Sequence, residues 1–160
     1  AGGRDAGLPG AEGIHAGENG VSALDPNRDE TMLHQDLRMA WLRLCEAALN
    51  LGCPIFLVEG YRSARRQELL YAQGRTAPGP IVTHARAGQS WHEAGRAIDF
   101  AFRGPDPWSS KHPWMVIGHM ATHLGLEWGG DWSPKKIDKP HLQLTQGLTL
   151  DQALAQMQET

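Results

Sequence analysis

Apolar side chains recur at helical spacing over residues 29–51, and Gly52 follows the last of them, which predicts a helix that stops at this glycine. The next segment, residues 54–59, is a short apolar run that predicts a buried strand. A serine then opens a helical stretch over residues 63–73, where its hydroxyl can cap the first turn. Residues 74–88 contain prolines and glycines and predict a loop.

Strict alternation marks the middle of the chain, where Ile98, Phe100 and Phe102 share one face of a predicted strand over residues 97–102. Asp99 stands on the opposite face, among alanines. The other predicted elements are a helix over 113–124, strands over 126–128 and 141–144, and a last helix that opens with a capping box at 149–152. This order of helices and short strands predicts an α+β domain with a small, mostly antiparallel sheet flanked by helices.

The composition suits a single globular domain with a substantial core, because the chain has 160 residues and 41% of them are hydrophobic. Residues 1–28 are rich in glycine and poor in large apolar side chains, so they bury too little surface to offset their ordering entropy. We therefore expect a flexible tail over residues 1–28 and one folded domain over residues 29–160. At helical rise, Cys45 and Cys53 would lie about 10 Å apart, too far for a disulfide, so we expect buried free thiols.

Charge and hydropathy argue against two classes of partner. The net charge is −3 and the pI is near 6.2, so no strong electrostatic attraction to nucleic acid is expected. No apolar run approaches the length of a membrane span, and no segment combines a basic start, an apolar stretch and a cleavage site. We expect no membrane insertion, and no signal peptide is visible.

Four polar residues suggest a hydrolytic metal site. Asp99 and His141 each project from the polar face of a predicted strand, and adjacent strands would bring them to one point. His92 precedes Gly95, whose conformational freedom allows a sharp bend that returns the imidazole toward Asp99. Two imidazoles and one carboxylate are the ligands of a catalytic zinc that keeps a position open for water. Asp138 is a spare acid that can take the proton from that water.

Two other metal-binding patterns are rejected. His119 and His123 are spaced as in a helical zinc-peptidase motif, but Met120 stands where that motif has its catalytic glutamate. Non-haem iron oxygenases also use two histidines and a carboxylate, but their acid usually follows the first histidine by two residues, and here the gap is seven. We therefore expect no function for the helical histidine pair.

A family resemblance extends well beyond these ligands, over about residues 30–145. The matching blocks are Gly60-Tyr61-Arg62-Ser63, Arg66-Gln67, residues 70–76, Pro78-Gly79, Ile81-Val82-Thr83, Ser90-x-His92-x-x-Gly95-x-Ala97-x-Asp99-Phe100, Trp128-Gly129-Gly130-Asp131-Trp132 and Asp138-x-Pro140-His141-x-Gln143. The chain closely resembles the M15 family of zinc peptidases, and most strongly its peptidoglycan L-alanyl-D-glutamate endopeptidases, which include phage endolysins and bacterial wall-remodelling enzymes. The resemblance implies that residues 29–160 form an M15-like catalytic domain with its zinc site on the polar face of the sheet.

The resemblance also implies roles for individual residues. His92, Asp99 and His141 would hold one zinc ion per chain. Asp138 would be the catalytic base, and Arg62 would polarise the scissile carbonyl or stabilise the oxyanion. The side chains expected to bind or orient substrate are Gln67, Ser90, Trp128 and Trp132, although both of the tryptophans also suit an aromatic core.

The function that the resemblance implies is zinc-dependent hydrolysis of the L-Ala–D-Glu amide in the peptide stem of peptidoglycan, by a cell-wall lytic enzyme of the endolysin type. Two alternatives stay open: a D,D-carboxypeptidase on peptidoglycan, and a noncatalytic wall-binding module of the same fold. Peptidoglycan is then the expected partner, and we expect a monomer that acts in the cell wall or periplasm. A phage-encoded enzyme without a signal peptide would stay cytoplasmic until its release.

Overall fold

The computed structural model describes residues 25–158, so nearly all of the predicted tail over residues 1–28 lies outside the described residues. The helices and strands in chain order are the 3₁₀ turn η1 (Glu30–Met32), α1 (Gln35–Asn50), β1 (Ile55–Glu59), α2 (Ala64–Ala72), β2 (Ala97–Phe102), α3 (Trp114–His123), β3 (Glu127–Trp128), the 3₁₀ turn η2 (Gly129–Asp131), β4 (His141–Gln143) and α4 (Leu150–Gln158). All four predicted strands are present, and β2 has the predicted bounds.

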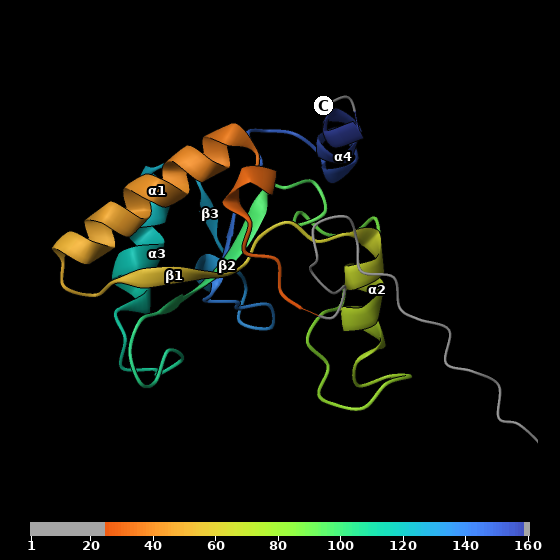
Figure 1. Ribbon diagram of the computed structural model, residues 1–160, viewed down its shortest axis with the longest axis horizontal. Helices are drawn as coiled ribbons and strands as arrows, with labels where there is room; N and C mark the ends of the chain where they lie inside the picture. Colours follow the sequence, from red (N-terminus) through yellow and green to blue (C-terminus); the bar gives the residue numbers. More distant parts are fainter. Residues whose placement is uncertain (1–24, 159–160) are drawn as a thin grey trace, which may run out of the picture.

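The four strands form one antiparallel sheet in the order β1-β2-β4-β3, with β2 and β4 at its centre (Figure 1). The predicted α+β fold with a small antiparallel sheet is confirmed. In the β2–β4 pair, Asp99 lies opposite His141. Because directly opposed residues of antiparallel strands leave the same face of the sheet, these two side chains share a face.

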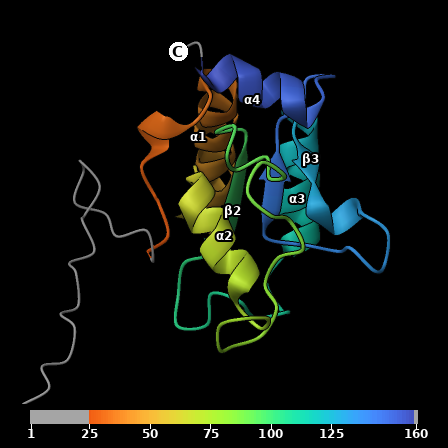
Figure 2. The same cartoon turned by 90° about the vertical axis from the view of Figure 1, so that its right-hand side faces the viewer.

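The other face of the sheet carries the hydrophobic core. Ile98, Phe100 and Phe102 of β2 are at most 1% exposed. Helices α1 and α3 contact each other, and α2 lies apart from them in Figure 1. In Figure 2, which is turned by 90°, α2 is the helix in front. The largest fully buried helical side chains of this core are Leu37, Trp41 and Leu44 of α1 and Ile117 of α3. Packing of the apolar side chains on this face leaves the opposite face of the sheet for polar chemistry.

The first helix begins later than the sequence predicts. Asp29 caps the short turn η1 by accepting hydrogen bonds from the backbone N–H and the hydroxyl of Thr31. Leu33 then adopts an extended conformation with ψ of 148°, which interrupts the helix, and α1 starts at Gln35 with His34 as its N-cap. Leu33 is nevertheless buried in the core. The spacing of apolar residues therefore continues across the interruption, and this is why spacing alone predicted one helix.

Two predicted helix starts are confirmed by their cap hydrogen bonds. At α2, the hydroxyl of Ser63 accepts from the backbone N–H of Arg66 at 3.1 Å. At α4, Oγ1 of Thr149 accepts from the backbone N–H of Gln152 at 3.3 Å, and Oε1 of Gln152 accepts from the backbone N–H of Thr149 at 2.9 Å. These reciprocal bonds are the predicted capping box.

Cys45 and Cys53 are free thiols, as the sequence predicts, but both are half-buried rather than fully buried. Among the helices of residues 25–158, none has the length and apolar character that crossing a membrane requires.

Candidate metal centre

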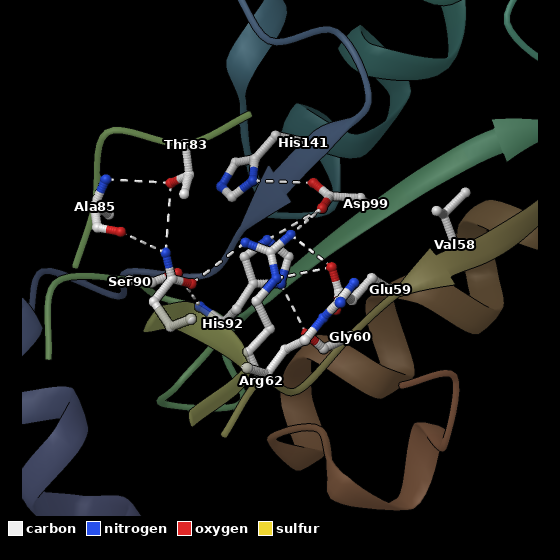
Figure 3. Close-up of polar contacts among 12 residues, drawn as sticks. Val58, Glu59, Gly60, Arg62, Thr83, Ala85, Ser90, His92, Asp99 and His141 are labelled. Carbon is white, nitrogen blue, oxygen red and sulfur yellow. Dashed lines mark hydrogen bonds and ion pairs between the residues drawn. The ribbon is translucent and has the colours of Figure 1, made fainter. Parts of the chain in front are cut away.

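The centre of the sheet brings two of the predicted metal ligands together. Asp99 of β2 and His141 of β4 are register partners, so their side chains leave the same face. The Nδ1 atom of His141 lies 3.3 Å from Oδ1 of Asp99 (Figure 3). Strand pairing therefore places the two side chains as the alternation of the sequence suggests.

A tight turn carries His92 to the same point. The turn ends at Gly95, whose φ of +64° is a left-handed conformation that favours glycine. A Cβ at this position would also lie 2.9 Å from the carbonyl oxygen of Met32. The turn places Nε2 of His92 at 3.4 Å from Oδ2 of Asp99. Both the backbone conformation and the close approach thus require glycine where the imidazole turns toward the carboxylate.

Hydrogen-bond acceptors orient both imidazole rings. Nδ1 of His92 lies 2.7 Å from the carbonyl oxygen of Gly60, and a carbonyl only accepts, so this nitrogen carries the proton and Nε2 presents its lone pair. Nε2 of His141 lies 3.0 Å from Oε1 of Gln143, which leaves Nδ1 as the open nitrogen. The amide of Gln143 is itself oriented, because its Nε2 donates to a carboxylate oxygen of Glu127 at 2.9 Å. In its neutral form, each ring therefore has its lone pair on the nitrogen that faces the same point.

The three side chains fit a metal ion. One ligand atom from each of His92, Asp99 and His141 lies within 4.8 Å of the others. Two oriented imidazole nitrogens and a carboxylate oxygen are the donors of zinc sites that keep one position open. Within residues 25–158, no other group of three or more His, Cys, Asp or Glu side chains is placed to hold an ion. The helical pair is not part of such a group, and His119 contacts Asp131 instead, at 3.1 Å.

The charges of the site shift the pKa values of its acids in opposite directions. Burial alone would raise the pKa of Asp99, but the charges and hydrogen bonds of His92 and His141 hold it well below its usual range. Burial and the negative charge of Asp99 raise the pKa of Asp138. Burial would lower the pKa of His141, but its hydrogen bond to Asp99 and the charge of that carboxylate raise it. Asp99 is therefore the ionised carboxylate among the candidate ligands, and Asp138 is the acid that more readily holds a proton.

Arg62 reaches the site from the turn that follows β1. Its NH2 group donates to Oδ2 of Asp99 at 2.8 Å, and its Nε donates to Oε2 of Glu59 at 2.8 Å (Figure 3). The side chain is 12% exposed. The guanidinium thus lies beside the candidate metal ligands, where it bridges two carboxylates.

The contribution of Glu59 was missed by the sequence reasoning. Uninterrupted alternation would place Glu59 on the face of Ile55 and Leu57, in the core. The register between β1 and β2 shifts after Leu57, so that Glu59 rather than Val58 lies opposite Asp99. This β-bulge turns the carboxylate of Glu59 to the polar face. The one feature of the sequence that could have indicated this role is the position of an acidic residue at the end of an apolar run.

A cavity of about 1080 Å³ opens over the candidate ligands. Ser90 and Trp132, two of the residues expected to bind substrate, are among its lining residues, as are Asp138 and Arg62. The ring of Trp132 lies with its centroid 5.1 Å from that of His141. The cavity therefore joins the candidate ligands, the spare acid and the arginine in one space.

Gln67 is fully buried and is not among the residues that line the cavity. Its amide donates to the carbonyl oxygen of Ala85 at 2.7 Å, and its Oε1 lies 3.5 Å from the NH1 group of Arg62. Gln67 thus connects the arginine to the loop that walls the cavity, and it does so from below the surface.

Trp128 lies in the core, and it too is absent from the cavity lining. A Cβ at Gly118 or at Gly130 would overlap its ring, so two glycines make room for it. Its indole N–H donates to the carbonyl oxygen of Lys139 at 2.7 Å. Of the two interpretations of this tryptophan, the structure favours packing, and the hydrogen bond ties the core to the segment that carries Asp138.

Comparisons with known proteins place the chain in a family. Two family models described as D-alanyl-D-alanine carboxypeptidase match it, the VanY model over residues 30–113 and an M15 peptidase model over residues 83–144. The chain is also 42% identical to the peptidoglycan L-alanyl-D-glutamate endopeptidase CwlK of Bacillus subtilis (strain 168), in an alignment of 123 residues that covers 70% of this chain and 73% of that protein. The chain belongs to the M15 peptidase family. This is the family that its sequence blocks resemble, and it is a family of metallopeptidases.

Solved structures share the fold of this M15 peptidase. The L-Ala D-Glu endopeptidase ChiX of Serratia marcescens is 24% identical, with a TM-score of 0.52, and the match covers 79% of this chain and 87% of that one. A mutant of the D,D-pentapeptidase VanY, from a VanB-type vancomycin resistance cassette and in complex with Zn(II), is 17% identical, with a TM-score of 0.55 and coverage of 76% and 83%. At these identities the likeness concerns the fold.

Proposed function

We propose that this M15 peptidase is a cell-wall lytic enzyme that hydrolyses the amide between L-Ala and D-Glu in the peptide stem of peptidoglycan, and that it depends on zinc. The observation that carries the proposal is the convergence of His92, Asp99 and His141 beneath a cavity that Asp138 and Arg62 also line. The 42% identity to a peptidoglycan L-alanyl-D-glutamate endopeptidase supports the choice of bond.

His92, Asp99 and His141 would hold one zinc ion per chain. Zinc bound there supplies a Lewis acid that activates water and polarises the scissile carbonyl. The chain contributes the orientation of the imidazoles, because Gly60 and Gln143 keep the other ring nitrogens protonated. We expect metal analysis of the purified protein to find one zinc per chain, and to find it lost in His141→Ala. A variant that kept its full zinc content would refute this ligand set.

Asp138 is the proposed general base. It lines the same cavity as the three candidate ligands, and burial with the charge of Asp99 raises its pKa. A carboxylate so placed accepts a proton from the attacking water and delivers it to the leaving amine. We expect Asp138→Asn to lower turnover at least ~100-fold while the zinc content stays unchanged. Full turnover in this variant would overturn the assignment.

Arg62 is the proposed electrostatic stabiliser of the transition state. Its guanidinium is permanently cationic and lines the cavity, where negative charge develops on the scissile oxygen. We expect Arg62→Gln to lower kcat ~100-fold with a much smaller change in KM, because the contact strengthens only as charge develops. An effect confined to KM would indicate that Arg62 binds substrate without stabilising the transition state.

A D,D-carboxypeptidase is the second candidate function. Both family models carry that description, and the D,D-pentapeptidase VanY shares the fold. The two reactions give different products from a muramyl pentapeptide, because the endopeptidase exposes a new amino terminus on D-Glu and the carboxypeptidase frees D-Ala. We expect mass spectrometry of a timed digest to find the new D-Glu terminus. Free D-Ala as the sole product would favour the second candidate.

We also propose that residues 29–160 form the catalytic domain, and that the protein acts in the cell wall as a monomer. The VanY match begins at residue 30, which supports the domain boundary. A protein that starts at residue 29 is expected to keep the full activity, and a fall in its kcat would contradict the boundary.

Light scattering of the whole chain is expected to give a mass near 17.5 kDa, whereas twice that mass would indicate a dimer.

A further inference from the structure

Glu59 is a buried carboxylate to which the proposed reaction assigns no task. The residue is 4% exposed, and the β-bulge at the end of β1 sets it opposite Asp99 on the polar face of the sheet. Burying a carboxylate costs free energy unless the charge is paired and hydrogen-bonded. The partners of Glu59 therefore indicate what it does in the site.

Each carboxylate oxygen of Glu59 holds one arginine. Oε2 accepts from Nε of Arg62 at 2.8 Å, and Oε1 accepts from Nε of Arg66 at 2.8 Å. The arginine side chains are 12% and 13% exposed, so these pairs are not the solvated surface pairs that contribute little. The carboxylate thus joins the end of β1 to the turn that carries Arg62 and to the first turn of α2.

These bonds engage one edge of the Arg62 guanidinium. Nε and NH2 both lie 2.8 Å from Oε2 of Glu59, and NH2 also donates to Oδ2 of Asp99 at 2.8 Å (Figure 3). Within the described part of the chain, NH1 has one long contact, 3.5 Å from Oε1 of Gln67. A planar guanidinium that is bonded along one edge cannot rotate freely, so NH1 keeps a fixed position as the donor left for a substrate oxygen.

We propose that Glu59 is a positioning residue that holds Arg62 by this edge, so that NH1 meets the oxygen on which negative charge develops. The inference rests on the proposed function, and it gives Glu59 no contact with substrate. Glu59 also weakens the ion pair between Arg62 and Asp99, because it shares the charge of the guanidinium. Without it, Asp99 is the remaining carboxylate partner of Arg62 among residues 25–158, and the guanidinium would compete more strongly with a metal ion for that ligand.

A double-mutant cycle in the full, zinc-loaded chain tests the inference. Glu59→Gln keeps the shape of the side chain but leaves one acceptor oxygen for two arginines. We call the two bonds from Oε2 of Glu59 to Nε and NH2 of Arg62 the clamp. We expect kcat to fall ~10–100-fold and KM to change less than about threefold, because the clamp acts in the transition state. In an Arg62→Gln background, the same change is expected to lower kcat by less than about twofold, because no guanidinium is left to position.

The matched control is Glu46→Gln, the same chemical change at an exposed position of α1 that does not line the cavity. It is expected to keep the wild-type kcat. A kcat for Glu59→Gln within about twofold of wild type, or losses that simply multiply in the double variant, would overturn the inference. Should Glu59→Gln fail to fold, Glu59→Asp takes its place, because it keeps the charge and withdraws it by one methylene, and the same criteria apply.

A signal from the arginine itself separates this inference from the proposed function. The ¹H–¹⁵N signal of Nε in Arg62, identified by its absence from the Arg62→Gln spectrum, is expected to exchange slowly with water in the wild type and rapidly in Glu59→Gln. A wild-type protein that cleaves no stem peptide but shows this difference would refute the proposed function and retain the clamp. A signal that Glu59→Gln leaves unchanged would refute the clamp, whatever the activity.

Discussion

Gly129 offers a way to move Asp138 without changing its carboxylate. The φ of Gly129 lies outside the left-handed region, so alanine can adopt its backbone conformation. An added Cβ would nevertheless overlap the carbonyl oxygen of Asp138 and lie 3.1 Å from the Cβ of that residue. The carbonyl oxygen of Gly129 also accepts a hydrogen bond of 3.0 Å from the backbone N–H of Asp138. The two backbones are therefore in direct contact, and Gly129→Ala must separate them.

The size of that separation sets the size of the expected effect. Relieving the overlap requires the backbone at Asp138 to move by about 1 Å. A misplacement of about 1 Å at a reacting group costs ~100-fold in rate, and overpacking of this kind costs about 1–3 kcal/mol of stability. Two of the candidate zinc ligands, His92 and Asp99, lie on other segments of the chain. The third, His141, donates its backbone N–H to the carbonyl oxygen of Asp138 at 3.1 Å, but its pairing with Asp99 in the sheet holds it in place. We therefore expect Gly129→Ala to keep its zinc and to lose ~100-fold in kcat.

The assay is kcat for cleavage of the L-Ala–D-Glu bond in a muramyl peptide, measured beside thermal unfolding. Gly125→Ala is the control, because Gly125 has a φ of +87° and an added Cβ would find nothing within 4 Å. That change is expected to lower stability by about 1–2 kcal/mol through backbone strain, with kcat unchanged. A kcat for Gly129→Ala within about threefold of wild type would refute the reasoning that this contact positions Asp138. Equal decreases in kcat for Gly129→Ala and Gly125→Ala would show that the loss of activity results from reduced stability.

Three further changes test separate parts of the structure. Gln143→Leu removes the acceptor that orients His141, so zinc affinity is expected to fall ~10–100-fold in a chelator competition. An unchanged zinc affinity would show that the ring needs no such partner. Burial raises the pKa of Cys45 to about 12. In a Cys53→Ser protein, alkylation of Cys45 at pH 8 is therefore expected to be about a thousandfold slower than alkylation of free cysteine, because only the thiolate reacts. The rate is expected to rise up to pH 11 as more of the thiol ionises. Thr149→Ala removes the capping box of α4 and is expected to lower the free energy of unfolding by about 1 kcal/mol in urea titration, with kcat unchanged.

The part of the site that lies on strands could be predicted from the sequence. Period-two alternation determines which face each side chain leaves, so it predicts Asp99 and His141 on the polar face, and their pairing in the sheet confirms this. His92 could be added because Gly95 permits the bend that brings it back, and the glycine does adopt a positive φ. Local rules were sufficient here because each of these features depends on a few neighbouring residues.

Features that depend on contacts between distant segments could not be predicted in this way. The position of Glu59 depends on a bulge in the pairing of β1 with β2, and a bulge leaves the apolar pattern of the strand unchanged. For Trp128, the same residues suit a cleft wall or a core, and its burial depends on the space that Gly118 and Gly130 leave for its ring. The start of α1 was misplaced because Leu33 is buried without being helical.

Mass spectrometry of purified peptidoglycan, digested by the protein with and without a zinc chelator, tests the proposed chemistry most directly. Hydrolysis by the zinc-loaded site predicts cleavage between L-Ala and D-Glu, seen as new D-Glu amino termini, which disappears on chelation and returns when zinc is added. The absence of any cleavage by folded, zinc-loaded protein on several types of cell wall would contradict it.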